Sequence, residues 1–215
     1  MVDAIFTNNP DNFIPVEYWR GGAPARPWCN SRASYYGSNY TPHMIYDGIL
    51  DAEYFSSQYL AKFNLRKPVP TDVTLDLTGG PAYSPVNWEF TVSVCIESDG
   101  TGRDLRIYVI EVNDAYPTYP AYARNTFRQA AATEDVTLAA GECTDVVRKL
   151  DFDSIALSYP EGVKIVAWAQ DPVSPPPGSV AAEVHQAVSF DVENLPGLYA
   201  GFETGDLSEW STAYP

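Results

Sequence analysis

Apolar residues recur with a helical period in the first third of the chain and with a strand period after it. Residues 51–66 place Phe55, Tyr59 and Phe63 four positions apart, which gives one apolar stripe and predicts an amphipathic helix. Acidic residues in its first turn and basic residues at its end suit the helix dipole. The Lys-Pro-Val-Pro stretch that follows, residues 67–70, predicts a short stiff linker between two domains.

Beyond the linker, apolar and polar residues alternate in short segments that turn residues separate. Such alternation predicts strands with one buried face, and about seven of them are typical of an antiparallel β-sandwich. Gly79-Gly80-Pro81 predicts a turn, and residues 124–133 favour a short helix. The predicted strands cover residues 71–77, 88–97, 105–112, 136–138, 143–152, 163–170 and 180–192.

Three shorter segments precede the predicted helix. Residues 13–19 alternate well enough for a strand, although a proline within them restricts it to a sheet edge or a strand start. Residues 28–33 fit one helical turn. Residues 43–46 form an apolar run between a proline and an Asp-Gly turn, which predicts a further strand.

The composition favours an extracellular, β-rich protein. The 215 residues are 45% hydrophobic and 19% charged, with 15 Tyr, 18 Pro and 14 Gly, so the chain can bury a core and carries many turn-forming residues. The net charge is -15, and the 13 cationic residues are scattered singly among 28 acidic ones. Nucleic acid and anionic membranes need a basic patch, so we expect neither as a partner. No apolar run approaches the ~20 residues of a membrane span.

Three widely separated cysteines contain neither a CxxC motif nor the spacing of a zinc site. Cys95 and Cys143 fall on two predicted strands, so a disulfide between them and two separate buried thiols both remain open. Cys29 follows a tryptophan, and we expect a buried thiol there rather than a nucleophile.

The remaining polar residues predict no catalytic residues, no metal site and no cofactor. His43 and His185, the two histidines, lie in different predicted domains, and no Ser-His-Asp arrangement is visible. Asp47, Asp51 and Glu53 do not have the spacing of a calcium-binding EF-hand loop, so turn and helix capping explain them better.

Tyrosines are the candidate ligand-binding residues. A Tyr/Pro loop in the predicted sandwich could stack on a sugar or a peptide, and the alternative is a loop that packs on the protein itself. The candidate surface consists of Tyr35, Tyr36, Tyr40, Tyr116, Tyr119 and Tyr122.

A set of short motifs carries a family resemblance. The first is R-x-x-YYG-x-x-x-TP-x-x-x-YDG, which runs from Arg32 to Gly48, and the others are LRIYVIEV, RNTFRQ, LAAGE, VKIVAWAQD and EVHQAV. In this order they are similar to the secreted Omp28-related proteins of bacteria, over most of residues 13–192. The resemblance implies a thioredoxin-like domain joined to an immunoglobulin-like β-sandwich, and a cis peptide bond before Pro42.

The chain departs from that family at its redox motif. Thiol-disulfide exchange needs two thiols at a helix N-terminus, and no cysteine precedes Phe13. We therefore expect an α+β protein, in which a truncated thioredoxin-like α/β unit (residues 1–67) precedes an antiparallel immunoglobulin-like β-sandwich (residues 68–194). Residues 195–215 would be a tail or the start of a further extracellular module. A missing strand would leave backbone groups unpaired, and a second chain could pair with them.

The leading functional hypothesis is a non-catalytic bacterial module, secreted or on the cell surface, that acts by binding or assembly rather than as an enzyme. Its partners would be other protein chains at an open sheet edge, or glycan. Three alternatives remain open: a fragment of a thiol-disulfide protein with its CxxC upstream, a carbohydrate-binding module, and a fibre subunit that self-assembles by strand donation.

Overall fold

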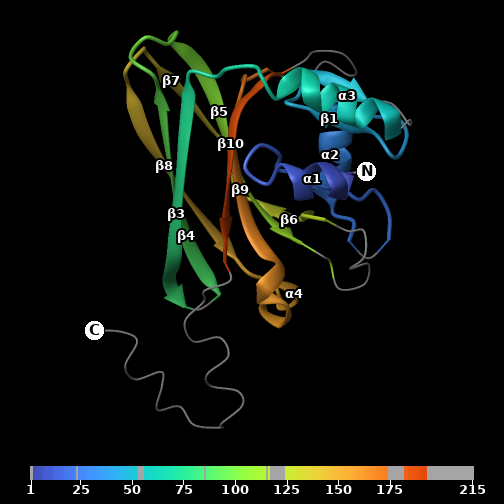
Figure 1. Ribbon diagram of the computed structural model, residues 1–215. Helices are drawn as coiled ribbons and strands as arrows, with labels where there is room; N and C mark the ends of the chain where they lie inside the picture. The colour runs from blue at the N-terminus through green and yellow to red at the C-terminus, as the bar shows by residue number, and fades with distance from the viewer. Residues whose placement is uncertain are drawn as a thin grey trace.

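Two antiparallel β-sheets pack face to face in the computed structural model, and an N-terminal helical unit covers the outer face of the larger sheet (Figure 1). In Figure 1 the helices α1, α2 and α3 lie together on one side of strands β9 and β10, and the three-stranded sheet lies on the other. The structure describes residues 2–22, 24–52, 56–84, 86–114, 116, 124–173 and 182–192.

The smaller sheet contains three strands in the order β3-β4-β8, and the burial of β4 alternates as its sequence predicts. The predicted turn at Gly79-Gly80-Pro81 is wrong, because β3 continues through it and Gly79 pairs with Phe90. A Cβ atom on Gly79 would lie 2.2 Å from the Phe90 ring, so glycine lets the strand pass close to that side chain. The strands are β3 (Val73–Ser84), β4 (Asn87–Ile96) and β8 (Cys143–Asp151).

The larger sheet has the order β10-β9-β5, and both β6 and β7 pair with the far edge of β5. The short helix predicted within residues 124–133 is wrong, since β6 forms there. Pairing with β5 and the burial of Phe127 outweigh the local helical preference. The strands are β5 (Arg103–Asn113), β6 (Thr126–Ala130), β7 (Glu134–Leu138), β9 (Val163–Gln170) and β10 (Val184–Asp191).

The main core lies between the two sheets and is almost entirely aliphatic and aromatic. Phe90, Val92 and Val94 of β4 face Ile107 and Ile165 of the larger sheet, and each is at most 1% exposed. Helix α4 (Ser154–Ser158) and the 3-10 turn Pro160–Gly162 connect β8 to β9 at one end of this core.

The N-terminal unit contains three helices and a two-stranded antiparallel hairpin. Its core holds Tyr46, Tyr59 and Phe63, which belong to the apolar pattern seen in the sequence. The predicted helix begins later than expected: Asp51 lies in strand β2, opposite Ile45, whereas Glu53 and Phe55 lie outside the described residues. The elements are α1 (Val2–Asn8), α2 (Pro27–Tyr35), β1 (Met44–Tyr46), β2 (Leu50–Ala52) and α3 (Ser56–Arg66).

Residues 13–19 are extended, but the strand predicted there is wrong. Glu17 forms a single parallel bridge to Thr126, through backbone hydrogen bonds with Asn125 and Phe127. Pro15 has no N–H to donate, and its carbonyl accepts a hydrogen bond from the Asn125 side chain instead. The segment therefore attaches the N-terminal unit to the edge of the larger sheet.

A second apolar cluster joins the N-terminal unit to the sandwich. Cys29 of α2 packs with Tyr108, Phe127 and Trp168 on the outer face of the larger sheet, and Trp28 stacks on Phe127 with their ring centres 4.6 Å apart. The two parts thus share a core across the linker. No helix in the described ranges is long and apolar enough to cross a membrane.

Candidate functional site

A cleft of about 1510 Å³ lies between the N-terminal unit and the outer face of the larger sheet. Val166 and Trp168 of β9, together with residues 183–187, form one side of it. Residues 11–21 and residues 40–48 line it from the N-terminal unit. Residues 40–48 of the N-terminal unit and residues of β9 and β10 therefore line the same cleft.

Arg32 of α2 lines this cleft and is only 5% exposed. Aromatic rings from the helix and from the sheet surround its guanidinium, and such rings attract a cation through their electron-rich faces. The guanidinium carbon lies 4.6 Å from the ring centre of Tyr35, 4.7 Å from Tyr36, 4.9 Å from Tyr108, 5.4 Å from Trp28 and 5.6 Å from Trp168.

The Arg32 guanidinium also joins a buried hydrogen-bond network. Its Nη2 donates to the Tyr36 hydroxyl at 2.5 Å and to Gln170 Oε1 at 3.2 Å. Gln170 Nε2 donates in turn to the Tyr36 hydroxyl and to the Ala182 carbonyl. Burial raises the pKa of Tyr36, which keeps its hydroxyl neutral. The Nε atom of Arg32 is buried and has no hydrogen-bond partner among the described residues.

The turn at Asp47-Gly48 docks the hairpin of the N-terminal unit onto the start of β10. The Asp47 carbonyl accepts a hydrogen bond from Val184 N at 2.8 Å. Gly48 has a φ of +74°, and a Cβ atom there would lie 2.0 Å from the Ala182 carbonyl oxygen, so only glycine fits. Arg66 pairs with both Asp47 and Glu183 across this contact. The sequence suggested only capping for Asp47, whose docking role depends on a partner 137 positions away.

The four candidate tyrosines that the structure describes do not form one surface. Tyr35 and Tyr36 belong to the ring cage around Arg32, and Tyr40 lines the cleft. Tyr116 is 5% exposed and packs against Arg128 elsewhere, so it presents no stacking platform. Tyr119 and Tyr122 lie outside the described residues.

The peptide bond between Thr41 and Pro42 is cis, and both residues line the cleft beside Tyr40. The next residue, His43, stacks on Tyr40 with a ring-centre distance of 4.6 Å. The His43 side chain is 8% exposed, and in the described part of the chain neither of its ring nitrogens has a hydrogen-bond partner. Asp51 Oδ2, at 3.7 Å from Nε2, is too distant for a hydrogen bond.

His185 also lines the cleft and belongs to a chain of charged groups. Its Nε2 lies 2.8 Å from Asp171 Oδ1, and its Nδ1 lies 3.1 Å from Arg103 Nη1. Arg103 Nη2 contacts both carboxylate oxygens of Asp72 at 2.6 Å. Within the described ranges, His185 has no hydroxyl or thiol partner that it could activate as a nucleophile, and no group of three metal-ligating side chains occurs.

Glu17 supplies a carboxyl group to the cleft wall. Burial raises its pKa to about 7, although its Oε2 accepts a hydrogen bond from Trp19 Nε1. The group is therefore partly protonated near neutral pH, and its negative charge is weaker there than that of an exposed glutamate.

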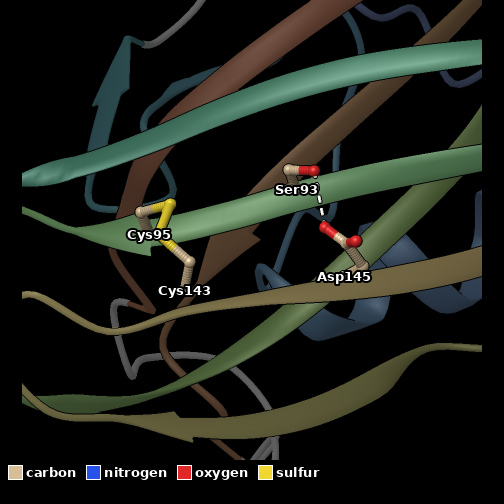
Figure 2. The surroundings of a disulfide bond; sticks show 4 residues. All are labelled: Ser93, Cys95, Cys143 and Asp145. Carbon is tan, nitrogen blue, oxygen red and sulfur yellow. Dashed lines mark hydrogen bonds between the residues drawn. A yellow bond between two sulfur atoms is a disulfide. The ribbon is translucent and has the colours of Figure 1, made fainter.

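The disulfide joins Cys95 and Cys143, which lie directly opposite each other on β4 and β8 (Figure 2). It lies on the outer face of the smaller sheet, with Cys143 exposed to solvent. Two positions along the same strands, Ser93 Oγ donates to Asp145 Oδ1 at 2.6 Å. Cys29 is completely buried, and burial raises the pKa of its thiol, so it is not a reactive nucleophile.

No protein-family model matches the sequence, and no curated protein is significantly similar to it. Three solved structures that match part of this chain have TM-scores below 0.5. A domain of the outer membrane lipoprotein Omp28 from Porphyromonas gingivalis is 14% identical, and the match covers 58% of this chain and 91% of that one with a TM-score of 0.38. A β-glucosidase from Kluyveromyces marxianus is 16% identical over 57% of this chain and 14% of that one, with a TM-score of 0.32. CsgH from R. palustris is 11% identical over 57% of this chain and 97% of that one, with a TM-score of 0.27.

Proposed function

We propose that this protein is a non-catalytic extracellular module that binds an extended segment of another protein in the cleft. The observation that carries this proposal is the edge of β1. Met44, Ile45 and Tyr46 line the cleft, and within the described residues β1 pairs only with β2. An unpaired strand edge offers backbone donors and acceptors to an incoming strand.

An oxidising compartment is supported by the Cys95–Cys143 disulfide, because cytosolic thiols are normally kept reduced. The low content of charged residues and the acidic net charge agree with a secreted or cell-surface location. The bacterial origin rests on the family resemblance of the sequence motifs alone.

The finer fold assignment belongs to the same proposal. The sandwich pairs β3-β4-β8 against β10-β9-β5-β6, which resembles the strand order of immunoglobulin-like sandwiches. A cis-proline, an antiparallel hairpin and a helix follow one another in residues 42–66, which supports a shortened thioredoxin-like unit. In such a unit the edge of β1 is where a further strand would pair.

A peptide selection tests this function. A random peptide library displayed on phage is selected on the full-length protein, and the selected peptides are then measured by calorimetry against two variants. Ala187 lies opposite Trp168 in the cleft lining, so Ala187→Trp fills the space beside that ring. Val147 is 44% exposed on the outer face of the smaller sheet, so Val147→Trp is the matched control.

We expect the selected peptides to lose at least about 10-fold in affinity for Ala187→Trp and to bind Val147→Trp as they bind the natural protein. We also expect amide exchange at residues 44–46 to slow when peptide is bound. Peptides that bind both variants equally well, or a selection that enriches none, would contradict the proposed function.

A further inference from the structure

Resting on the proposed function, we propose that the cleft recognises a carboxylate on the bound segment through the guanidinium of Arg32. The carboxylate could come from a C-terminus or from an Asp or Glu side chain. Both sources present the same planar anion, which a guanidinium binds with two parallel hydrogen bonds.

Arg32 differs from the other arginines in its partners. The sequence has nine arginines among 28 acidic residues, and seven of the nine form ion pairs with carboxylates. Arg20 has no such partner but is exposed to solvent. Arg32 is buried, and no carboxylate in the described residues lies within ion-pair distance of it.

The surrounding rings stabilise the charge of Arg32 without completing its hydrogen bonds. Of its donor atoms, Nη2 contacts Tyr36 and Gln170, and Nε is buried without a partner in the ranges that the structure describes. A buried cation with an unmade hydrogen bond is costly, because it has lost water and gained nothing equivalent. A bound anion would satisfy both the charge and the free donor.

His43 provides an independent second observation in the same cleft. Its side chain is more than nine-tenths buried, and no described residue forms a hydrogen bond with either ring nitrogen. It comes from the strand region after the cis-proline, whereas Arg32 comes from α2. Two separate elements therefore leave unsatisfied polar groups in the lining of one cleft.

Seven carboxylates line the cleft, and among the described residues none lies within ion-pair distance of Arg32. Three of them pair with other arginines of the lining, because Arg66 contacts Asp47 and Glu183, and Arg103 contacts Asp72. Burial raises the pKa of a fourth, Glu17, to about 7, which weakens its negative charge near neutral pH. The guanidinium of Arg32 therefore has no carboxylate partner among the described residues, and an anionic group on the ligand would supply one.

The test changes the ligand first, so that the fold of the protein is untouched. Each selected peptide is measured by calorimetry as the free acid, as the C-terminal amide, and with every Asp and Glu replaced by Asn and Gln. We expect one of the two neutral forms to bind about 10- to 100-fold more weakly, because a charge-assisted hydrogen bond is lost. Loss on amidation identifies a C-terminal carboxylate, and loss on side-chain neutralisation identifies an acidic residue.

A second measurement identifies the receiving group. Acetate and inorganic phosphate are titrated into ¹⁵N-labelled protein, and the arginine Nε–H signals are followed, with Arg32→Lys used to assign the signal of Arg32. We expect acetate to shift the Arg32 signal more than phosphate does, and we expect free-acid peptide to shift it at lower concentration than acetate does.

Equal binding of all three peptide forms would overturn the carboxylate proposal, and so would an Arg32 signal that free-acid peptide does not move. If the same peptides still lost affinity for Ala187→Trp, the proposed binding function would stand without it. A selection that enriched no peptide at all would instead remove the proposed function.

Discussion

The two faces of the five-stranded sheet present different kinds of side chain to the elements that cover them. The inner face presents aliphatic side chains such as Leu105, Ile107 and Val109 to the smaller sheet. The outer face presents Tyr108 and Trp168 to the N-terminal unit, around a buried arginine. These five side chains are all at most 6% exposed, so burial alone does not distinguish them.

The difference lies in how strictly each face fixes its partner. Aliphatic contacts are non-directional, and many arrangements of similar volume satisfy them. The outer contact depends on hydrogen bonds of Arg32, Tyr36 and Gln170, which constrain distance and angle. The inner face therefore contributes general stability, whereas the outer face positions the N-terminal unit and with it the walls of the cleft.

Two matched substitutions, one in the core on each side of the larger sheet, should have the largest effect and test this difference directly. Phe90 is 0% exposed in the main core, and Phe127 is 1% exposed under the N-terminal unit, between Tyr18 and Trp28. Each Phe→Ala change should lower the free energy of unfolding by about 3–5 kcal/mol, because it leaves a cavity of similar size. Phe90→Ala should reduce amide-exchange protection throughout the protein, and Phe127→Ala mainly in residues 13–36.

Chemical denaturation measures the totals, and hydrogen exchange locates the losses. Tyr83, which is 78% exposed on β3, gives the control substitution Tyr83→Ala, which should change little. If Phe127→Ala reduced protection in both sheets as much as Phe90→Ala did, the two faces would belong to one cooperative unit and would not differ in the part of the protein that they stabilise.

Glu111 is an acidic residue on the largely aliphatic inner face of β5. Its burial predicts a pH dependence of the free energy of unfolding that is of intermediate size. It shares a face of β5 with Ile107 and Val109, is fully buried, and accepts a hydrogen bond from Gln129 Nε2 through Oε2. Burial raises its pKa from about 4.5, the usual value for a glutamate, to about 7. The folded state thus binds the proton more tightly than the unfolded state, and the stability this provides is lost as pH rises from about 4.5 to about 7.

Glu111→Gln should remove that loss, since the amide is neutral at every pH and its carbonyl can still accept from Gln129. The variant should be more stable than the natural protein at pH 8 by roughly 1–3 kcal/mol and should lose this advantage near pH 4.5. Urea denaturation across pH 4.5–8 measures the difference between the two proteins. Because the pKa of Glu17 is also raised to about 7, both proteins keep part of the slope, and parallel curves would contradict the assignment to Glu111.

Most of the sandwich could be predicted because its strands have one buried face each. The burial of β4 alternates from Trp88 to Ile96 as its sequence does, and a period of two leaves only one register for a core. The alternation failed where glycine and proline suggested a turn at Gly79-Gly80-Pro81. Glycine is needed at position 79 because the Phe90 ring of the neighbouring strand leaves no room for a Cβ atom, and no local sequence pattern indicates that contact.

The cleft was harder to predict, because its groups come from distant parts of the chain. Arg32 and Gln170 are separated by 138 positions, and neither has a local sequence pattern that marks it as buried. The sequence predicts Tyr35 and Tyr36 as ligand-binding residues but not that their rings surround Arg32. A basic residue in a strongly aromatic segment, RASYY, is the one signal that could have indicated a cage.

The smallest expected effect concerns the ion pair at the docking turn. Asp47 has a φ of +46°, a conformation that asparagine adopts at least as readily, so Asp47→Asn removes the charge and keeps the backbone. Its side chain is 43% exposed and Arg66 retains Glu183, so the free energy of unfolding should fall by less than about 1 kcal/mol. The difference should shrink further in 1 M salt, where exposed charges are screened.

Exchange at Val184 N–H should not change, because that hydrogen bond uses the backbone carbonyl of residue 47. Asp47→Ala, in contrast, should cost more, because alanine disfavours a positive φ. A loss above 2 kcal/mol for Asp47→Asn would mean that charge, rather than the ring cage and the backbone contact, holds the outer face together.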